Sequence, residues 1–276
     1  MSDRQSSRTA FGTAYMRAAH QLLDSPPRIL EDPIIVTLLG SQAIKHITQA
    51  SEEYNTPERQ ALLAHVVLRS RFAEDRLASA VERGVLQYVI LGAGLDTFAL
   101  RQPPWARKLR IVEVDHAGTQ ETKRGLLKLA GLAVPDNVTF AAIDFEQETL
   151  REGLVRHEVP FGVPTFFSWL GVTMYLNEAA IDNVLQTIMG FPAGSEVVLT
   201  FARADGPPSP FEKRSAELGE QWLSHFTPES MEARLRGCGL SNVEFLLKDE
   251  AAAGYFRSSG TSLPVPRRTT IVCAQV

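Results

Sequence analysis

The sequence has few of the features that assign a protein to a specialised class. Only two of its 276 residues are cysteine, Cys238 and Cys273, and they form neither a disulfide framework nor a metal-binding spacing. The formal net charge of -4 gives no electrostatic basis for binding nucleic acid or anionic lipid. No apolar run approaches the ~20 residues that span a bilayer. These absences predict a globular protein that has neither a nucleic-acid nor a membrane partner.

The first ten residues, MSDRQSSRTA, lack the apolar core of a signal peptide. We therefore expect a cytoplasmic protein. No heptad pattern or apolar interface stripe is visible, so the sequence leaves the oligomeric state open.

Residues 1–85 are predicted to form a helical N-terminal cap. Apolar residues recur at helical spacing over residues 11–22, until two consecutive prolines end the pattern. Asp32-Pro33 and Thr56-Pro57 are typical helix starts, because proline fits the first helical position. Gly84 is a typical residue at the end of the last of these helices.

Residues 86–276 alternate between short β-branched runs and helical patterns. Strands separated by helices and apolar on both faces are typical of a parallel sheet covered on both sides. The sequence predicts a mostly parallel, seven-stranded, Rossmann-like α/β fold with helices on both faces. An irregular insertion near residues 203–226, marked by Pro207-Pro208 and Pro210, is expected to close over the site as a lid. The expected strands are 87–91, 110–115, 138–144, 164–169, 195–201, 242–248 and the last residues, and the expected helices are 119–133, 146–157, 177–190, 211–223 and 228–238.

The run VILGAGLDTFALR, residues 89–101, breaks from a predicted strand into a glycine turn. Gly92, Ala93 and Gly94 leave backbone that a nucleotide-like ligand can approach, at the strand end where open parallel sheets bind ligands. The third glycine of the dinucleotide fingerprint would stand at Thr97, and Asp96 adds a negative charge. Both features disfavour a pyrophosphate at this turn.

The next two predicted strands end in acids. Asp115 lies 21 residues after Gly94, where a carboxylate can accept hydrogen bonds from ribose hydroxyls. Asp144-Phe145 ends the third strand, where an acid can accept from an adenine amino group. Each Asp could instead cap a following helix, and Glu113 is an alternative acid with shorter reach. Together the three strand ends favour an adenosine ligand without a pyrophosphate, S-adenosylmethionine.

LGAGLDTFALR with VEVD after it and LRSRFAEDRL before it resembles the leucine carboxyl methyltransferase family, in particular its bacterial S-adenosylmethionine-dependent branch. The likeness extends from TAYMRAAHQLLDSPPRILEDP through SWLGVTMYL and EQWLSHFTPESM to the last strand. This resemblance implies the class I methyltransferase fold and S-adenosylmethionine as cofactor.

The resemblance also implies roles for individual residues. Arg71, before Phe72, matches the position that binds the carboxylate of the cofactor, and a guanidinium grips a carboxylate bidentately. Asp115 matches the ribose acid and Asp144-Phe145 the adenine-edge pair. One position departs from the family, because many relatives have a glutamate where this chain has Leu170, which cannot accept a hydrogen bond.

The sequence identifies no catalytic residue and no metal site. A carboxylate acceptor is already ionised and needs no base, whereas a hydroxyl acceptor needs one. Tyr175 and His225 are candidates for the acceptor pocket. Tyr15 and His20 on the first helix are further candidates. His116 follows the ribose acid and is a poor base.

Three functions fit these patterns. The first is an S-adenosylmethionine-dependent O-methyltransferase acting on a carboxyl or hydroxyl group of a small or polyketide-like molecule. The second is a protein that binds this cofactor without transferring a methyl group, which Leu170 and the missing base suggest. The third is an NAD-dependent oxidoreductase, which Asp96 and Thr97 disfavour.

Overall fold

The computed structural model describes residues 7–145, 147–206, 210–267 and 270–276. Its centre is a seven-stranded sheet with the order β3-β2-β1-β4-β5-β7-β6. Neighbouring strands are parallel except that β7 runs antiparallel to both β5 and β6. The strands are β1 (Gln87–Leu91), β2 (Arg110–Asp115), β3 (Val138–Ala142), β4 (Thr165–Trp169), β5 (Glu196–Thr200), β6 (Ser241–Phe245) and β7 (Ile271–Gln275). The predicted mostly parallel α/β fold is confirmed.

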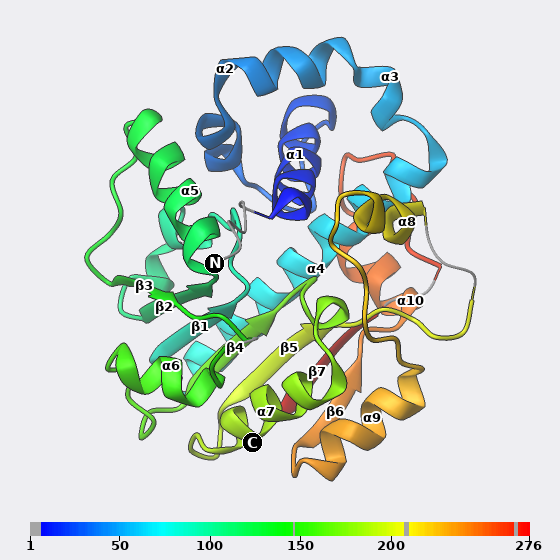
Figure 1. Cartoon of the computed structure of the whole chain (residues 1–276). Helices are drawn as coiled ribbons and strands as arrows, with labels where there is room; N and C mark the ends of the chain where they lie inside the picture. The colour runs from blue at the N-terminus through cyan, green and yellow to red at the C-terminus, as the bar shows by residue number, and fades with distance from the viewer. Residues whose placement is uncertain (1–6, 146, 207–209, 268–269) are drawn as a thin grey trace.

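Helices cover both faces of the sheet (Figure 1). The longer ones are α1 (Arg8–Leu23), α2 (Pro33–Gln49), α4 (Pro57–Glu82), α5 (Ala117–Leu129), α6 (Leu150–Arg156), α7 (Glu178–Met189), α8 (Pro210–Glu217) and α9 (Pro228–Gly237). Short elements are α3 (Ser51–Tyr54), α10 (Lys248–Ala251), the 3-10 turns η1 (Phe98–Leu100), η2 (Pro104–Ala106) and η3 (Thr173–Tyr175), and the π-helical turn η4 (Ala252–Phe256).

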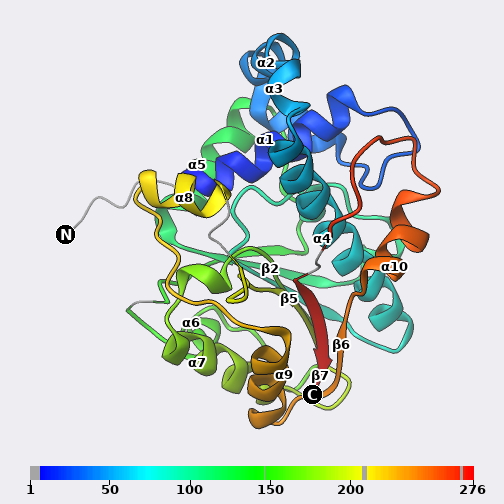
Figure 2. The same ribbon diagram turned by 90° about the vertical axis from the view of Figure 1, so that its right-hand side faces the viewer.

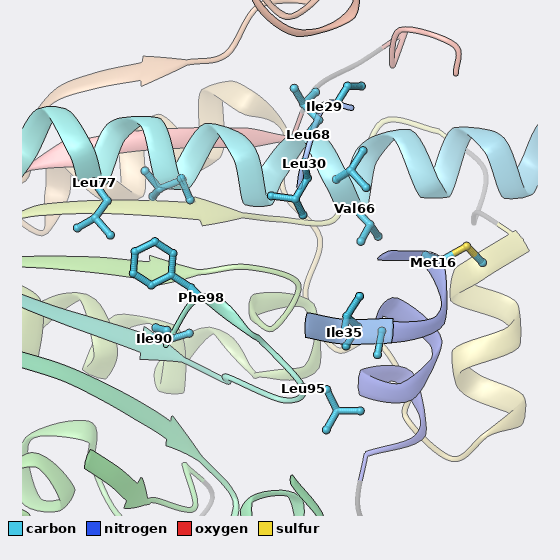
Figure 3. Close-up of a cluster of buried hydrophobic side chains, with 14 of the residues drawn as sticks. Met16, Ile29, Leu30, Ile35, Val66, Leu68, Leu77, Ile90, Leu95 and Phe98 are labelled. Atoms are coloured by element: carbon cyan, nitrogen blue, oxygen red, sulfur yellow. The ribbon is translucent and has the colours of Figure 1, made fainter. Parts of the chain in front are cut away.

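The central strands β1, β4 and β5 are buried on both faces because their side chains alternate between two apolar cores. Tyr88 and Ile90 of β1 join the core under α1, α2 and α4, part of which is drawn in Figure 3. Val89 and Leu91 join the opposite core, with α6, α7 and α9. This explains why the strands read as continuous apolar runs rather than as alternating ones.

The N-terminal helices begin where the prolines predict. The Asp32 side chain accepts a hydrogen bond from Ile35 N at 3.2 Å and caps α2, whose first residue is Pro33. Pro57 opens α4, although Thr56 makes no side-chain cap. Among the described residues, no helix combines the length and the apolar character that a membrane crossing needs.

The insertion between β5 and α9 differs from the prediction. The expected helix over 211–223 ends at Glu217, because Gly219 takes a φ of +82°, which interrupts a right-handed helix. The chain then runs without regular structure to α9, and Leu223 N donates to Met174 O at 2.6 Å. Pro207 and Pro208 lie outside the described residues. In both views α8 lies beside α1, so two helices that are far apart in the sequence are neighbours above the sheet (Figure 2).

Candidate functional site

The glycine turn after β1 is shaped by its neighbours in the fold. Gly92 and Gly94 have φ angles of +66° and +51°, which side chains other than glycine rarely adopt. A Cβ on Gly92 would lie 2.3 Å from Val172 Cγ2, and one on Gly94 would lie 3.2 Å from Ala10 Cβ. The turn therefore needs glycine both for its backbone angles and for the close approach of Val172.

Asp115 at the end of β2 is tied to this turn. Its Oδ2 accepts a hydrogen bond from Gly94 N at 2.5 Å, and its Oδ1 accepts one from His116 N at 2.7 Å. Burial raises the pKa of Asp115, and these two backbone hydrogen bonds oppose that effect. Asp144 lies next along the sheet edge, with its Oδ2 3.7 Å from His116 Nε2.

A large cavity of ≈ 1690 Å³ opens at the carboxyl ends of the parallel strands. It lies where β1 and β4 are neighbours and the chain order of the sheet reverses, which is where open α/β sheets bind ligands. Eight residues predicted for the site line it: Gly92, Ala93, Gly94, Asp115, Asp144, Phe145, Leu170 and Tyr175. Its volume exceeds the roughly 300–1,000 Å³ of a pocket for one small ligand, so two ligands can occupy it side by side.

Arg71, predicted to bind the carboxylate of the cofactor, does not line this cavity. Its side chain is exposed and pairs with Asp75 at 2.7 Å, one turn further along α4. Arg69 lines the cavity instead. Residues two positions apart on a helix are separated by about 200° around its axis, so Arg69 and Arg71 face opposite sides.

Three other candidates also lie outside the cavity. Tyr15 packs edge-on against His46, with ring centroids 6.0 Å apart. His225 Nε2 lies 2.9 Å from Glu212 Oε1, and His225 lines a separate ≈ 590 Å³ groove between α7 and α9. His20 is fully buried and its Nδ1 lies 2.6 Å from Asp24 Oδ2. Each has protein partners that hold it away from the strand ends.

A family model for leucine carboxyl methyltransferases matches residues 10–189. A protein of Bacillus subtilis (strain 168) named "Putative S-adenosyl-L-methionine-dependent methyltransferase YktD" is 31% identical over 295 residues, covering 95% of each chain. A Mycobacterium marinum protein with the same name, apart from YktD, is 30% identical over 76% of this chain and 72% of its own. The chain belongs to the leucine carboxyl methyltransferase family. It is an S-adenosylmethionine-dependent methyltransferase.

Solved structures agree with this fold. A DUF574 family protein from Streptomyces avermitilis superposes with a TM-score of 0.59 at 16% identity, covering 98% of this chain and 97% of its own. A putative methyltransferase from Thermobifida fusca gives 0.55 at 18% identity, covering 93% and 96%. The predicted class I methyltransferase fold is confirmed.

The sequence analysis did not identify the residues of α4 that line the cavity. His65 and Arg69 are one turn apart and both line it. A Cβ on Gly171 would lie 2.5 Å from Arg69 Nη1, so the guanidinium packs against the backbone just after Leu170. Within the described part of the chain Arg69 forms no ion pair, although the charge of Asp96 acts on it from a greater distance. The helical period was a usable signal, because Arg69 follows the buried Val66 by three residues.

The pKa values of both groups are lowered by burial. Burial lowers the pKa of Arg69 to about 10, so the guanidinium stays charged at neutral pH. Burial, with the charge of Arg69 as the second cause, lowers the pKa of His65 to about 3. His65 is therefore neutral at neutral pH and a weak base.

The segment after β5 supplies aromatic side chains that the sequence reasoning also missed. Phe211 and Trp222 line the cavity with Tyr175, and the rings of Tyr175 and Trp222 meet edge-to-face with centroids 6.5 Å apart. Phe211 and Trp222 are 6.0 Å apart. The cavity thus has a polar side at the strand ends and an aromatic side under α8.

Proposed function

We propose that this methyltransferase transfers a methyl group to an oxygen atom, of a carboxyl or hydroxyl group, on a small or polyketide-like acceptor. The observation that carries the proposal is the single cavity with two unlike sides. Polar groups at the strand ends suit the cofactor, and the aromatic side under α8 suits the apolar body of an acceptor.

The residues at the strand ends fit S-adenosylmethionine. In our assignment Asp115 receives the ribose hydroxyls, and Asp144 with Phe145 receives the adenine edge. Gly92 to Gly94 lie along the methionine chain. We assign to Arg69 the role first expected of Arg71, binding the carboxylate of the cofactor. Arg69 is a charged donor at the cavity that forms no ion pair among the described residues, and a carboxylate would supply one. Leu170 contributes an apolar contact only.

The chemistry of the cavity favours a carboxylate over a hydroxyl acceptor. When bound, the cofactor supplies a methyl group on a positively charged sulfur. A carboxylate is ionised at neutral pH and needs no base. His65, with its pKa near 3, is a poor base for an alcohol or a phenol, and His116 lies beside Asp144 on the adenine side. The protein's own contribution is then to align the acceptor and to exclude water.

Calorimetric titration with S-adenosylhomocysteine tests the cofactor assignment. We expect Asp115→Ala and Arg69→Ala each to weaken binding at least tenfold. Arg71→Ala is the matched control, because it removes an arginine from the same helix whose ion pair, among the described residues, is with Asp75. Lost binding in Arg71→Ala with retained binding in Arg69→Ala would reverse the assignment of the two arginines.

The second candidate, cofactor binding without methyl transfer, rests only on Leu170, an apolar side chain in the cavity wall, and the family assignment stands against it. Mass analysis of candidate acceptors separates the two. A gain of one methyl group on any acceptor excludes the second candidate. The expectation of a cytoplasmic protein that binds neither nucleic acid nor membrane stays a prediction.

A further inference from the structure

Helix α1 reaches both sides of the cavity. Thr9 and Thr13 in its first half line the cavity, as does Arg17 further along. At the standard rise, Thr9 and Arg17 are about 12 Å apart along the axis. The N-terminal end of α1 and Arg17 form hydrogen bonds to two different parts of the protein.

The N-terminal end of α1 is bonded to the segment 210–226. Glu220 Oε1 accepts from Arg8 N at 2.6 Å, and Glu220 Oε2 accepts from Ser7 Oγ at 3.1 Å. The Thr9 hydroxyl also donates to Glu220. A carboxylate at this position satisfies free N–H groups of the helix and complements its dipole. Ser7 caps α1 with its own side chain, and Glu220, more than 200 positions away, completes this cap.

Further along α1, Arg17 contacts the loop that follows the glycine turn. Arg17 Nη2 donates to Leu95 O at 2.5 Å, and Arg17 Nη1 donates to Asp32 Oδ2 at 3.0 Å. The Thr97 hydroxyl donates to Asp32 Oδ1 at 2.6 Å. Asp32 and Thr97 are fully buried and Arg17 is 5% exposed, so water does not compete for these bonds.

We propose that α1 couples the loop Leu95–Thr97 to the segment 210–226, with Arg17 and Glu220 as positioning residues. Leu95 and Asp96 line the cavity, so a cofactor at the glycine turn contacts this loop. The helix is a rigid connection that transmits this contact to the aromatic wall that receives the acceptor. Coupling of this kind is reciprocal, so loosening the segment also weakens cofactor binding. The inference rests on the proposed function, because it assumes the cofactor at the glycine turn.

Hydrogen exchange of residues 210–226, with and without S-adenosylhomocysteine, tests the forward direction. In the unmodified protein we expect the ligand to slow exchange in this segment at least fivefold. Thr97→Val, which keeps the shape but loses the hydroxyl, should abolish that gain. Thr97→Ser should restore it, which a merely structural role of the methyl group would not do.

Calorimetry tests the reverse direction. Glu220→Gln should weaken S-adenosylhomocysteine binding about fivefold, the lower end of typical coupling. Glu217→Gln is the matched control, because Glu217 lies on the same segment and pairs with Arg214 at 2.8 Å. Wild-type binding in Glu220→Gln, or a full gain of protection in Thr97→Val, overturns the coupling and leaves the proposed function standing. Absence of binding to the unmodified protein overturns both.

Discussion

Gly92 and Gly131 have the same backbone angle but different surroundings. Both have a φ of +66°, in the left-handed region. A Cβ on Gly92 would collide with Val172, whereas a Cβ on Gly131 would meet nothing within 4 Å. The pair therefore separates the backbone cost of a side chain at this angle from the cost of the clash.

We predict that Gly92→Ala lowers the free energy of unfolding by roughly 2–4 kcal/mol, the sum of strain and overpacking. Gly131→Ala should cost only about 1 kcal/mol, from the backbone angle alone. Urea unfolding of the two variants measures both values. Adding Val172→Ala to Gly92→Ala removes the colliding side chain and should recover part of the loss. Equal costs for the two glycine variants would contradict the clash.

At the same scale, residue identity was easier to predict than side-chain direction. The strand-end acids and the glycine turn lie in the cavity as expected, because strand ends of a parallel sheet share one edge. Arg69 and Arg71 occur in the run LRSRFAEDR, which contains three further charged residues, so charge alone does not single out one arginine. The spacing from the buried Val66 favours Arg69, and the packing of α4 on the sheet then places this arginine at the cavity.

Helix α4 carries His65 and Arg69 at the cavity and is held to the sheet near its other end. Glu196 of β5 is fully buried and accepts from Arg76 Nε at 2.7 Å and from Arg83 Nη2 at 2.6 Å. Removing one partner of a buried ion pair leaves charges without compensation. This clamp joins residues more than 110 positions apart, which no local sequence pattern could indicate.

Glu196→Gln keeps the shape and removes the charge. We predict a loss of roughly 2–3 kcal/mol in unfolding free energy, below the ~3–5 kcal/mol of fully buried pairs, because Arg76 and Arg83 are partly exposed. Glu244→Gln, a 63% exposed partner of Arg76, should change stability by less than about 1 kcal/mol. Thermal or urea unfolding compares them. Similar losses for both would show that the clamp adds nothing beyond a surface pair.

Helices were predictable where prolines and polar caps mark their starts, as at Asp32-Pro33, and less so where only a glycine ends them. The sequence suggested a helix through residue 223, and Gly219 ended it near residue 217. The short elements α3 and α10 have too few residues to show a helical period. What remained out of reach were the contacts that join distant elements, such as Glu220 at the start of α1.

On the scale of the whole molecule, the cavity is assembled from parts that are far apart in the chain. The sheet supplies acids and the glycine turn, α1 and α4 supply cations, and residues 210–226 supply aromatic rings. The core in Figure 3 fixes the first two relative to each other, since Met16 of α1, Val66 of α4 and Ile90 of β1 belong to one apolar cluster. The contacts that stabilise the fold also position the cavity wall. The protonation of a group in that wall therefore changes the free energy of unfolding.

His65 is a group in the cavity wall for which the direction of the pH effect on stability can be derived. Its pKa falls from 6.5 to about 3 on folding, because burial and Arg69 disfavour its charged form. Between pH 6.5 and 3 the unfolded chain binds a proton that the folded chain does not, so stability falls as the pH falls through this window. Burial raises the pKa values of Glu74, Glu113 and Asp115, which act in the opposite sense.

The comparison of the unmodified protein with His65→Gln isolates this group, because the carboxylates are present in both. We predict that the unfolding free energy of the variant decreases less between pH 7 and pH 5 than that of the unmodified protein. Urea unfolding at several pH values gives both profiles. Parallel profiles would mean that folding does not shift the pKa of His65, so that the ring would gain its proton between pH 7 and pH 5 in the folded protein as well.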